Sequence, residues 1–359
     1  MALRNAVGRT AQRLGLGPVA RAALKGARAT SSGAQTAVRV AHDRARALDG
    51  KRRWWGYRRD VKFGVRLEIV SGRPRVDALP VVMCLWHRPS RMSEILDTLE
   101  AQNVGRPIRL VLWNNAPEND DHYRDVFAHR IFRNISSIEL HSSGINMGGI
   151  GRFLAMRELT RTGYDGPFVM FDDDEVVSPY FLRDLLAAYR PGSITGWWAY
   201  RYDGTYYARR TLHHGEEANY IGTGGAACDS RLVRSRAFFD ALPERYLFLE
   251  DMWMSAFARW NGWRLSKVDT PGDFAMREAD QHHGIFDLKT DFSLYLNDAV
   301  PVRDDIVNHR VHARTAWTPI ESDAQLDQER SSIVARYRDD YPKPLHEAPG
   351  TVVGPDDAS

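Results

Sequence analysis

Short apolar runs that end abruptly in polar residues recur through the first half of this 359-residue chain. A continuous apolar run of this length, bounded by turn residues, is typical of a strand buried on both faces. Four such strands are predicted, over Leu79–Trp86, Ile108–Trp113, Ile138–His141 and Phe168–Phe171. Apolar residues at helical spacing lie between them, over Ser90–Gln102 and Arg152–Thr162. Strands that alternate with helices predict an α/β fold with a largely parallel sheet.

Four consecutive acidic residues, Asp172–Glu175, follow the last of these strands without a break. The carboxyl ends of parallel strands meet at one edge of a sheet, where ligands bind in open α/β folds. We therefore expect the acids to share this edge with His87-Arg88, Asn114-Asn115 and the glycine-rich segment Ser142–Arg152. Adjacent carboxylates repel one another, and a hard cation such as Mg²⁺ or Mn²⁺ would offset that repulsion. The alternative is a solvated acidic loop.

The second half of the chain follows a different pattern. Tryptophan, tyrosine and arginine are concentrated over Thr195–Ala208, and Tyr220–Ala227 is a glycine-rich strand or loop. A helix is predicted to begin at Glu250-Asp251 and to run to Trp260, followed by a strand at Trp263–Leu265. Acidic residues in a first turn complement the helix dipole, which gives one purely structural reason for the Glu-Asp pair.

The first 59 residues differ from the rest of the chain in charge. They hold 14 Lys and Arg against two acids, while the whole chain has a net charge of +3, so the remainder is acidic. Residues 1–50 are predicted to form a basic tail or weak helix. The alternatives are contact with an anionic membrane, binding to a partner protein, or a role as an organellar transit peptide. Trp54 and Trp55 come next in the chain and are expected to be either an interfacial anchor or part of a packed helix. The alternation of apolar and polar residues over Val61–Val70 predicts a half-buried strand.

Domain boundaries and location are predicted from the same patterns. Residues 51–78 form a strand-containing lead-in, 79–317 the main domain, 318–341 a C-terminal helix and 342–359 a disordered tail. Cys84 and Cys228 lie in apolar runs, as buried thiols of a reducing compartment do. No stretch reaches the roughly 20 apolar residues of a membrane span. A cytoplasmic location, or a peripheral one at the inner face of the plasma membrane, is therefore expected. Nucleic acid is not an expected partner, because the body has no basic and aromatic platform.

Four motifs stand in a specific order along residues 79–285. Val81–Pro89 is a strand with an Arg-Pro turn, Ser143–Gly149 holds an Asn-x-Gly-Gly segment, and Phe171–Asp174 contains Asp-x-Asp. Gly224-Gly225 is followed, about 25 residues later, by Glu250-Asp251. Together these motifs resemble those of glycosyltransferases with the GT-A fold, most closely the family-2-like bacterial enzymes. The resemblance implies a Rossmann-like, mixed and mostly parallel sheet flanked by helices, with a nucleotide-sugar half over 79–178 and an acceptor half over 179–317.

The resemblance also implies an activity. A hexosyltransferase-type enzyme of this family moves a sugar from a nucleotide-diphosphate donor to a hydroxyl acceptor, here a saccharide or lipid-linked saccharide. The expected setting is the synthesis of cell-surface polysaccharide or glycolipid. Breaking the anomeric bond builds negative charge on the diphosphate, and Mn²⁺ or Mg²⁺ would neutralise that charge.

The metal ligands are expected within the acidic stretch. In the Asp-x-Asp pattern of the family, the second carboxylate binds the metal and the first supports it, which gives Asp174 and Asp172 here. Asp173 or Glu175 would take these roles if the register shifted by one residue. The family often adds a histidine ligand from a later loop, and the candidates in order of preference are His283, His282 and His309.

The acceptor hydroxyl must lose a proton as it attacks, and a carboxylate can take it as general base. Inverting members of the family use the aspartate of the Glu-Asp pair, so the resemblance implies Asp251 as base and Glu250 as the neighbour that shapes the site. A retaining, exostosin-like enzyme is the alternative. The nucleotide is expected to contact Arg88, Asn114, Asn115, Asn146, Gly148, Arg152, Asp172 and Asp173. The residues expected at the acceptor, which could equally serve core packing or tight turns, are Trp197, Trp198, Gly224 and Gly225.

Two other classes of protein fit parts of this pattern. A nucleotidyltransferase or metal-dependent phosphotransferase would need a glycine-rich, basic signature directly after the first strand, and Trp86–Pro89 lacks the glycines. A non-catalytic protein could use the tryptophans and the basic extension to bind carbohydrate or a lipid surface. Metal-dependent binding of a nucleoside diphosphate separates the glycosyltransferase from this second class.

Overall fold

The computed structural model describes residues 48–275 and 286–308 of the chain. Several predicted features lie outside these residues: most of the extension 1–50, the helix 318–341, the tail 342–359, and the three candidate histidines His282, His283 and His309. The chain divides into two units between Arg59 and Asp60. Within the described part, none of the helices combines the length and the apolar composition that a membrane span requires.

A helix covers residues 48–63, where the alternating pattern had predicted that a strand begins at Val61. The prediction is wrong for residues 61–63, and strand β1 comes later, at Glu68–Gly72. Tyr57, Asp60 and Val61 are buried at spacings of three and four residues, which is the period of a helix. Alternation over a few residues fits both periods, so the short pattern could not separate them.

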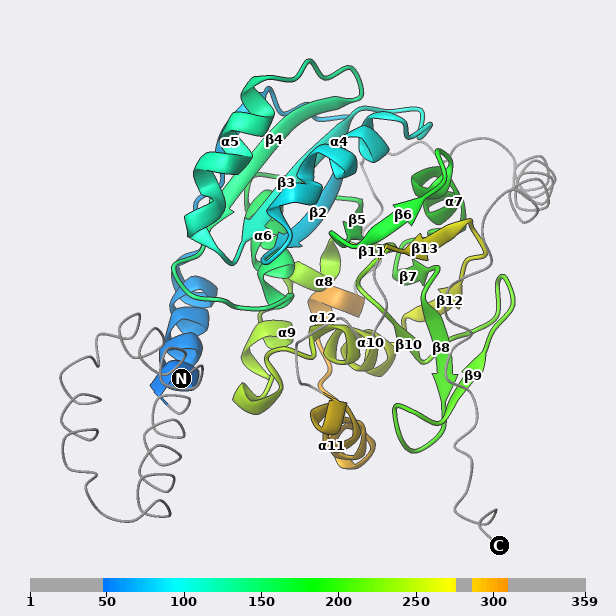
Figure 1. Ribbon diagram of the computed structural model, residues 1–359. Coiled ribbons are helices and arrows are strands. Elements are labelled where there is room, and N and C mark those ends of the chain that lie inside the picture. Colours follow the sequence, from blue (N-terminus) through cyan, green and yellow to red (C-terminus); the bar gives the residue numbers. More distant parts are fainter. Residues whose placement is uncertain (1–47, 276–285, 309–359) are drawn as a thin grey trace, which may run out of the picture. The chain divides into compact units, whose positions relative to one another are not determined.

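One mixed sheet of eight strands forms the centre of the second unit, in the order β1-β4-β3-β2-β5-β11-β7-β12 (Figure 1). β1 and β11 are antiparallel to their neighbours, and the other six strands run in one direction. The strands after β1 are β2 (Leu79–Leu85), β3 (Ile108–Asn114), β4 (Ile135–Ser142), β5 (Pro167–Phe171), β7 (Ser193–Gly196), β11 (Ala226–Asp229) and β12 (Arg264–Lys267). The predicted α/β fold with a mostly parallel sheet is therefore confirmed.

Helices cover both faces of this sheet, because successive side chains of a buried strand point to opposite faces. Val81, Met83 and Leu85 of β2 join the core under α4 (Met92–Glu100), α5 (Asp120–Ala128) and α7 (Phe181–Ala188). On the other face the Cys84 thiol reaches the carbonyl of Gly149, and α6 (Ile150–Arg161) packs on β2 and β3. The remaining helices are α8 (Arg231–Arg234), α9 (Arg236–Asp240), α10 (Glu250–Trp260), α11 (Phe286–Asp298) and α12 (Asp305–Asn308). Single 3-10 turns cover Pro89–Arg91, Pro117–Asn119 and Glu244–Tyr246.

Two small sheets extend the second half. β10 (Tyr220–Ile221), β8 (Ala199–Tyr202) and β9 (Arg209–Thr211) form an antiparallel group. β6 (Glu175–Val177) pairs with β13 (Gly272–Phe274), so the acidic stretch leads directly from β5 into a second strand. The acids are therefore held between two strands, and their backbone is fixed at both ends.

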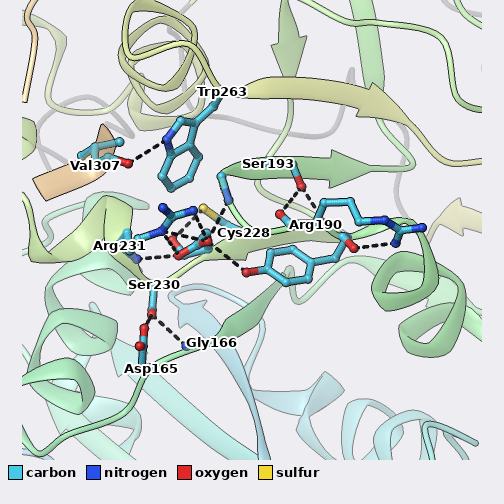
Figure 2. Close-up of polar contacts among 12 residues, drawn as sticks. Asp165, Gly166, Arg190, Ser193, Cys228, Ser230, Arg231, Trp263 and Val307 are labelled. Carbon is cyan, nitrogen blue, oxygen red and sulfur yellow. Dashed lines mark hydrogen bonds and ion pairs between the residues drawn. The ribbon is translucent and has the colours of Figure 1, made fainter. Parts of the chain in front are cut away.

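A buried polar network holds the far end of β11 (Figure 2). The carboxylate of Asp229 accepts hydrogen bonds from the Arg231 guanidinium at 2.8 Å, from the Gly192 amide at 2.9 Å and from the Tyr189 hydroxyl at 3.0 Å. The Arg231 guanidinium lies 5.5 Å from the ring centre of Trp263. A buried charge needs such partners, and these tie β11 to the segment before β7. Gly224-Gly225 precedes the opposite end of β11, so the network lies at the end of the strand away from these glycines.

Gly151 is a position where a side chain has no room. A Cβ added there would overlap the indole of Trp113, which is fully buried and donates a hydrogen bond to the Asn115 side chain at 3.0 Å. Gly151→Ala is therefore expected to destabilise the protein by roughly 1–3 kcal/mol through overpacking. Gly144→Ala is the matched control, since nothing lies within 4 Å of its added Cβ, and it should change stability by less than about 0.5 kcal/mol. Equal melting temperatures for the two variants would contradict this packing.

Candidate functional site

Polar segments follow four parallel strands at one edge of the sheet, as the sequence predicted. This carboxyl edge is formed by the ends of β2, β3, β4 and β5, and the segments after these strands hold Arg88, Asn114-Asn115, Ser143–Gly149 and Asp172–Glu175. Hydrogen bonds and ion pairs join the segments to one another. The edge is therefore a connected set of polar groups rather than four separate loops.

The two asparagines after β3 shape the glycine-rich loop. Asn114 is fully buried, and its side chain bonds Ala116 and Asp120 at 2.7–2.9 Å, which closes the turn after the strand. Asn115 accepts the backbone N–H of Met147 at 2.8 Å and donates to the carbonyl of Gly148 at 3.2 Å. Both were expected to contact the nucleotide. The structure shows their amides engaged within the protein.

Glycines allow the loop before α6 to pass close to α10. Gly148 has a φ of +65°, and an added Cβ would overlap the ring of Phe248. The side chain of Asn146 accepts the Gly148 amide at 2.8 Å and holds the turn. A Cβ at Gly149 would overlap the carboxyl of Glu250. The two glycines thus let the loop lie directly against the start of α10.

Arg152 joins the acidic stretch to α10. Its guanidinium is 2.8 Å from the carboxylate of Asp172 and 4.0 Å from that of Glu250, and it donates to the carbonyl of Thr223 at 3.3 Å. The side chain is buried, with the whole residue only 4% exposed. Burial alone would lower the pKa of Arg152, but the carboxylate charges, that of Asp172 foremost, outweigh it and raise the pKa. One buried cation therefore holds the two acidic motifs in a single site.

The other acids of the stretch crowd one another. Arg88 pairs with Asp173 at 2.5 Å and lies 3.5 Å from Asp174, and burial raises the pKa of Asp173. Burial, followed by the charge of Asp172, raises the pKa of Asp174 to about 7. Glu175 is buried and accepts hydrogen bonds from the Asp172 amide at 3.1 Å and the Trp197 indole at 3.3 Å. Its pKa is raised well above the ordinary value by burial and by Asp172.

Gly224 brings the glycine-rich strand to the same carboxylates. An added Cβ would overlap the carboxyl of Glu175 and would lie 2.8 Å from Oδ2 of Asp172, so only a glycine fits beside these acids. Within residues 48–275 and 286–308, no group of three His, Cys, Asp or Glu side chains could hold a metal ion by itself. A cation held by Asp172 and Asp174 would therefore need ligands besides the His, Cys, Asp and Glu side chains of these residues, such as phosphate oxygens or water.

Glu250 and Asp251 open α10, and their surroundings differ. Glu250 is buried, and burial together with the charge of Asp251 raises its pKa to about 8. Asp251 is half-buried; its Oδ1 accepts the Met252 amide at 2.7 Å and its Oδ2 accepts the Tyr220 hydroxyl at 2.5 Å. The raised pKa disfavours the charged form of Glu250. Asp251 is held in one orientation at both oxygens.

The tryptophans expected at the acceptor separate into two environments. Trp197 is 6% exposed and packs against Phe181 and Phe274, so it is part of the core. Trp198 is half-buried and lies edge-on to the rings of Tyr200 and Phe274, at 5.0 and 4.9 Å between ring centres. An added Cβ at Gly225 would overlap the Trp197 indole. Of the two tryptophans, Trp198 presents more surface.

Sequence reasoning missed Arg91 and Tyr220. Arg91 donates to the backbone carbonyl of Asp173 at 2.5 Å, and Tyr220 donates to Asp251. The Arg88-Pro89 turn could have drawn attention to Arg91 as a second cation beside the acids. Nothing in the sequence pairs Tyr220 with Asp251, because the contact joins β10 to a helix far along the chain.

Comparisons with known proteins add little to this geometry. No family model matches the chain, and no curated protein matches it. Among solved structures, the chain resembles the mannosyltransferase PcManGT of Pyrobaculum calidifontis, solved with GDP-Man and Mn²⁺, at 15% identity and a TM-score of 0.35 over 64% of each chain. It also resembles S. aureus TarS, solved with UDP-GlcNAc, at 13% identity and a TM-score of 0.40 over 73% of each chain.

Proposed function

We propose that this protein is a metal-dependent, inverting glycosyltransferase that moves a sugar from a nucleotide-diphosphate donor to a hydroxyl acceptor. The observation that carries the proposal is Arg152, buried between Asp172 and Glu250. It unites the Asp-x-Asp stretch with the Glu-Asp start of α10, which are far apart in the sequence. The proposed metal site and the Glu-Asp pair that holds the proposed base would then be neighbours, which supports transfer from a diphosphate donor.

The residues at the acidic stretch fit a divalent cation. The carboxyl groups of Asp172 and Asp174 are suitable ligands for a hard divalent ion. The charge of Asp172 contributes to the raised pKa of Asp174, and a cation would offset that repulsion. Mg²⁺ typically takes one or two protein carboxylates and completes its coordination with phosphate oxygens and water. This kind of coordination is compatible with a site that has no third protein ligand among the described residues. When bound, the cation would neutralise charge on the diphosphate leaving group.

Burial separates the roles of the two acids on α10. A general base must be ionised at the working pH, and burial with the charge of Asp251 raises the pKa of Glu250, which makes Glu250 the less suitable base. Asp251 is half-buried and oriented by Tyr220 and by its own helix. We therefore assign proton removal from the acceptor hydroxyl to Asp251. Glu250 fills the space beside Gly149 and holds Arg152 in place.

A panel of nucleotide-sugars tests this function. The full-length protein with Mn²⁺ is expected to release nucleoside diphosphate from at least one donor, because water can replace a missing acceptor at a slow rate. Addition of a chelator should stop the release. If no donor in a panel of UDP-, GDP- and dTDP-sugars gives metal-dependent release, the proposed function is wrong.

The helix over residues 48–63 suggests the surface at which the protein would bind its acceptor. Trp55 and Phe63 are 75% and 72% exposed, and Lys51, Arg52 and Arg59 are exposed on the same helix. Exposed aromatic rings among cations suit the interface of an anionic bilayer. We propose that this face contacts the inner surface of the plasma membrane, where a lipid-linked saccharide for cell-surface polysaccharide or glycolipid would be presented.

Vesicle sedimentation tests the membrane contact. The protein should sediment with vesicles of phosphatidylglycerol and phosphatidylcholine and less with phosphatidylcholine alone. Trp55→Ala should lower the partition coefficient roughly tenfold, because an exposed Trp loses its burial in the bilayer. Ile131→Ala is the control, since Ile131 is 93% exposed in another part of the chain and should not matter. Equal partition for Trp55→Ala and the unchanged protein would contradict the proposal.

A further inference from the structure

A chain of hydrogen bonds ends on the carboxylate of Asp251. The Tyr220 hydroxyl donates to Oδ2 of Asp251 at 2.5 Å, the Tyr206 hydroxyl donates to Tyr220 at 3.5 Å, and the ammonium of Lys289 donates to Tyr206 at 3.4 Å. The chain thus joins β10, the segment between β8 and β9, and α11. Every donor in it faces toward the carboxylate.

The surroundings favour the protonated forms of Tyr220 and Lys289. Tyr206 and Tyr220 are each only 2% exposed. Burial, followed by the charge of Asp251, raises the pKa of Tyr220 well above its ordinary value, so its hydroxyl stays a donor. Burial would lower the pKa of Lys289, but Tyr206 and Asp251 outweigh it and raise the pKa. A permanent cation therefore lies at one end of the chain and the proposed base lies at the other.

Tyr206 is held between two cations. The ammonium of Lys289 lies 4.7 Å from the ring centre of Tyr206, and the guanidinium of Arg209 lies 4.9 Å from it. Cations over an aromatic face are attracted by the ring quadrupole, which fixes the ring. A fixed Tyr206 in turn fixes the direction of its hydroxyl toward Tyr220. Hydrogen bonds aligned in this way polarise one another and strengthen the last bond, the one to Asp251.

We propose that Tyr220 is the positioning residue of the general base, supported by Tyr206 and Lys289; this inference rests on the proposed function. In the transfer step, the acceptor oxygen bonds to the anomeric carbon while the bond from that carbon to the diphosphate oxygen breaks. The electron pair leaves with the nucleoside diphosphate, and the acceptor proton moves to Asp251. Because the Tyr220 hydroxyl donates to Oδ2 of Asp251, it holds the carboxylate in one orientation before the step.

Other titratable groups face Asp251, and none of them replaces the role of Tyr220. Glu250 precedes it on α10, and its raised pKa depends partly on Asp251. Tyr202 on β8 lies in the same aromatic cluster, 6.4 Å from Tyr220 between ring centres, and burial raises its pKa to about 12. The structure shows no hydrogen bond from the Tyr202 hydroxyl to Asp251 among the contacts of the described residues. Tyr202→Phe therefore serves as a matched control that removes a hydroxyl from the same cluster.

Donor hydrolysis with a nucleotide-sugar that the unchanged protein accepts provides the test. Tyr220→Phe is expected to lower kcat by about tenfold or more, with the KM for the donor within about twofold. This split is expected because Tyr220 orients the carboxylate of Asp251 and does not contact the donor. Lys289→Met should lower kcat by less. Tyr202→Phe should leave both quantities unchanged.

An unchanged kcat in Tyr220→Phe would overturn the inference, and so would an equal loss of kcat in Tyr202→Phe. A second readout does not depend on activity. Thermal unfolding of Asp251→Ala, Tyr220→Phe and the double variant should show melting-temperature losses that are not additive, because both single changes remove one hydrogen bond. Additive losses would overturn the contact itself. Absence of turnover in the unchanged protein would instead refute the proposed function, so the two failures are distinguishable.

Discussion

Asp174→Asn is expected to lower metal-dependent release of nucleoside diphosphate by about 10²–10³-fold. Loss of a metal ligand removes charge stabilisation of the leaving diphosphate, which is worth several kcal/mol in comparable sites, and each 1.36 kcal/mol is a factor of ten. The fold should survive, because the change removes a buried acid whose pKa is already raised to about 7 by burial and by Asp172. Activity and melting temperature measured side by side separate these effects.

Asp77→Asn is the matched control for Asp174→Asn. Asp77 forms an exposed ion pair with Arg75 at 2.7 Å, and its loss should change neither activity nor melting temperature appreciably. If Asp174→Asn kept full turnover with Mn²⁺, Asp174 would not be a ligand. Full loss with Asp172→Asn or Asp173→Asn and none with Asp174→Asn would place the register one or two residues earlier.

Asp251→Asn is expected to reduce sugar transfer, and hydrolysis of the donor, by about 10²–10⁴-fold. This is the usual contribution of a general base, and the amide cannot take a proton from the attacking hydroxyl. The KM for the donor should stay nearly unchanged, because the carboxylate of Asp251 bonds Tyr220 and Met252 and not the metal site. Initial rates over a range of donor concentrations measure both parameters.

Glu250→Gln provides the comparison for Asp251→Asn. Burial and the charge of Asp251 raise the pKa of Glu250, so an amide of the same shape is a mild replacement for it. Its loss of activity should be clearly smaller than that of Asp251→Asn. A larger loss of activity in Glu250→Gln than in Asp251→Asn would exchange the two proposed roles. Full transfer activity in Asp251→Asn would remove Asp251 as the base.

The sheet and its acidic edge could be predicted from the sequence because both depend on local signals. A strand buried on both faces is a continuous apolar run, and β2, β3 and β5 all have this form. The polar residues that end each run mark the carboxyl edge without any knowledge of packing. The helix from Glu250 to Trp260 was predicted for the same reason, since its boundaries coincide with charged and polar residues.

The internal connections of the site could not be predicted in this way. Asn115 supports the glycine-rich loop, and Tyr220 supports Asp251, because folding brings distant segments into contact. Burial also decides the protonation of Glu250, and burial is a property of the folded chain. Trp197 and Trp198 are adjacent in sequence, yet one lies in the core and the other is half-buried. The sequence led to the same predicted role for both, because they are the same residue type.

Metal-dependent binding of a nucleoside diphosphate tests the central claim most directly. Melting temperatures of the full chain would be measured with UDP, GDP and dTDP, each with Mn²⁺ and with a chelator. A ligand at 100 times its Kd stabilises by about 2.7 kcal/mol, which is a rise of several degrees for a domain of this size. We predict such a rise for at least one nucleotide, only with Mn²⁺, and its loss in Asp174→Asn. No rise with any nucleotide, or an equal rise in Asp174→Asn, would contradict a metal-diphosphate site at the acidic stretch.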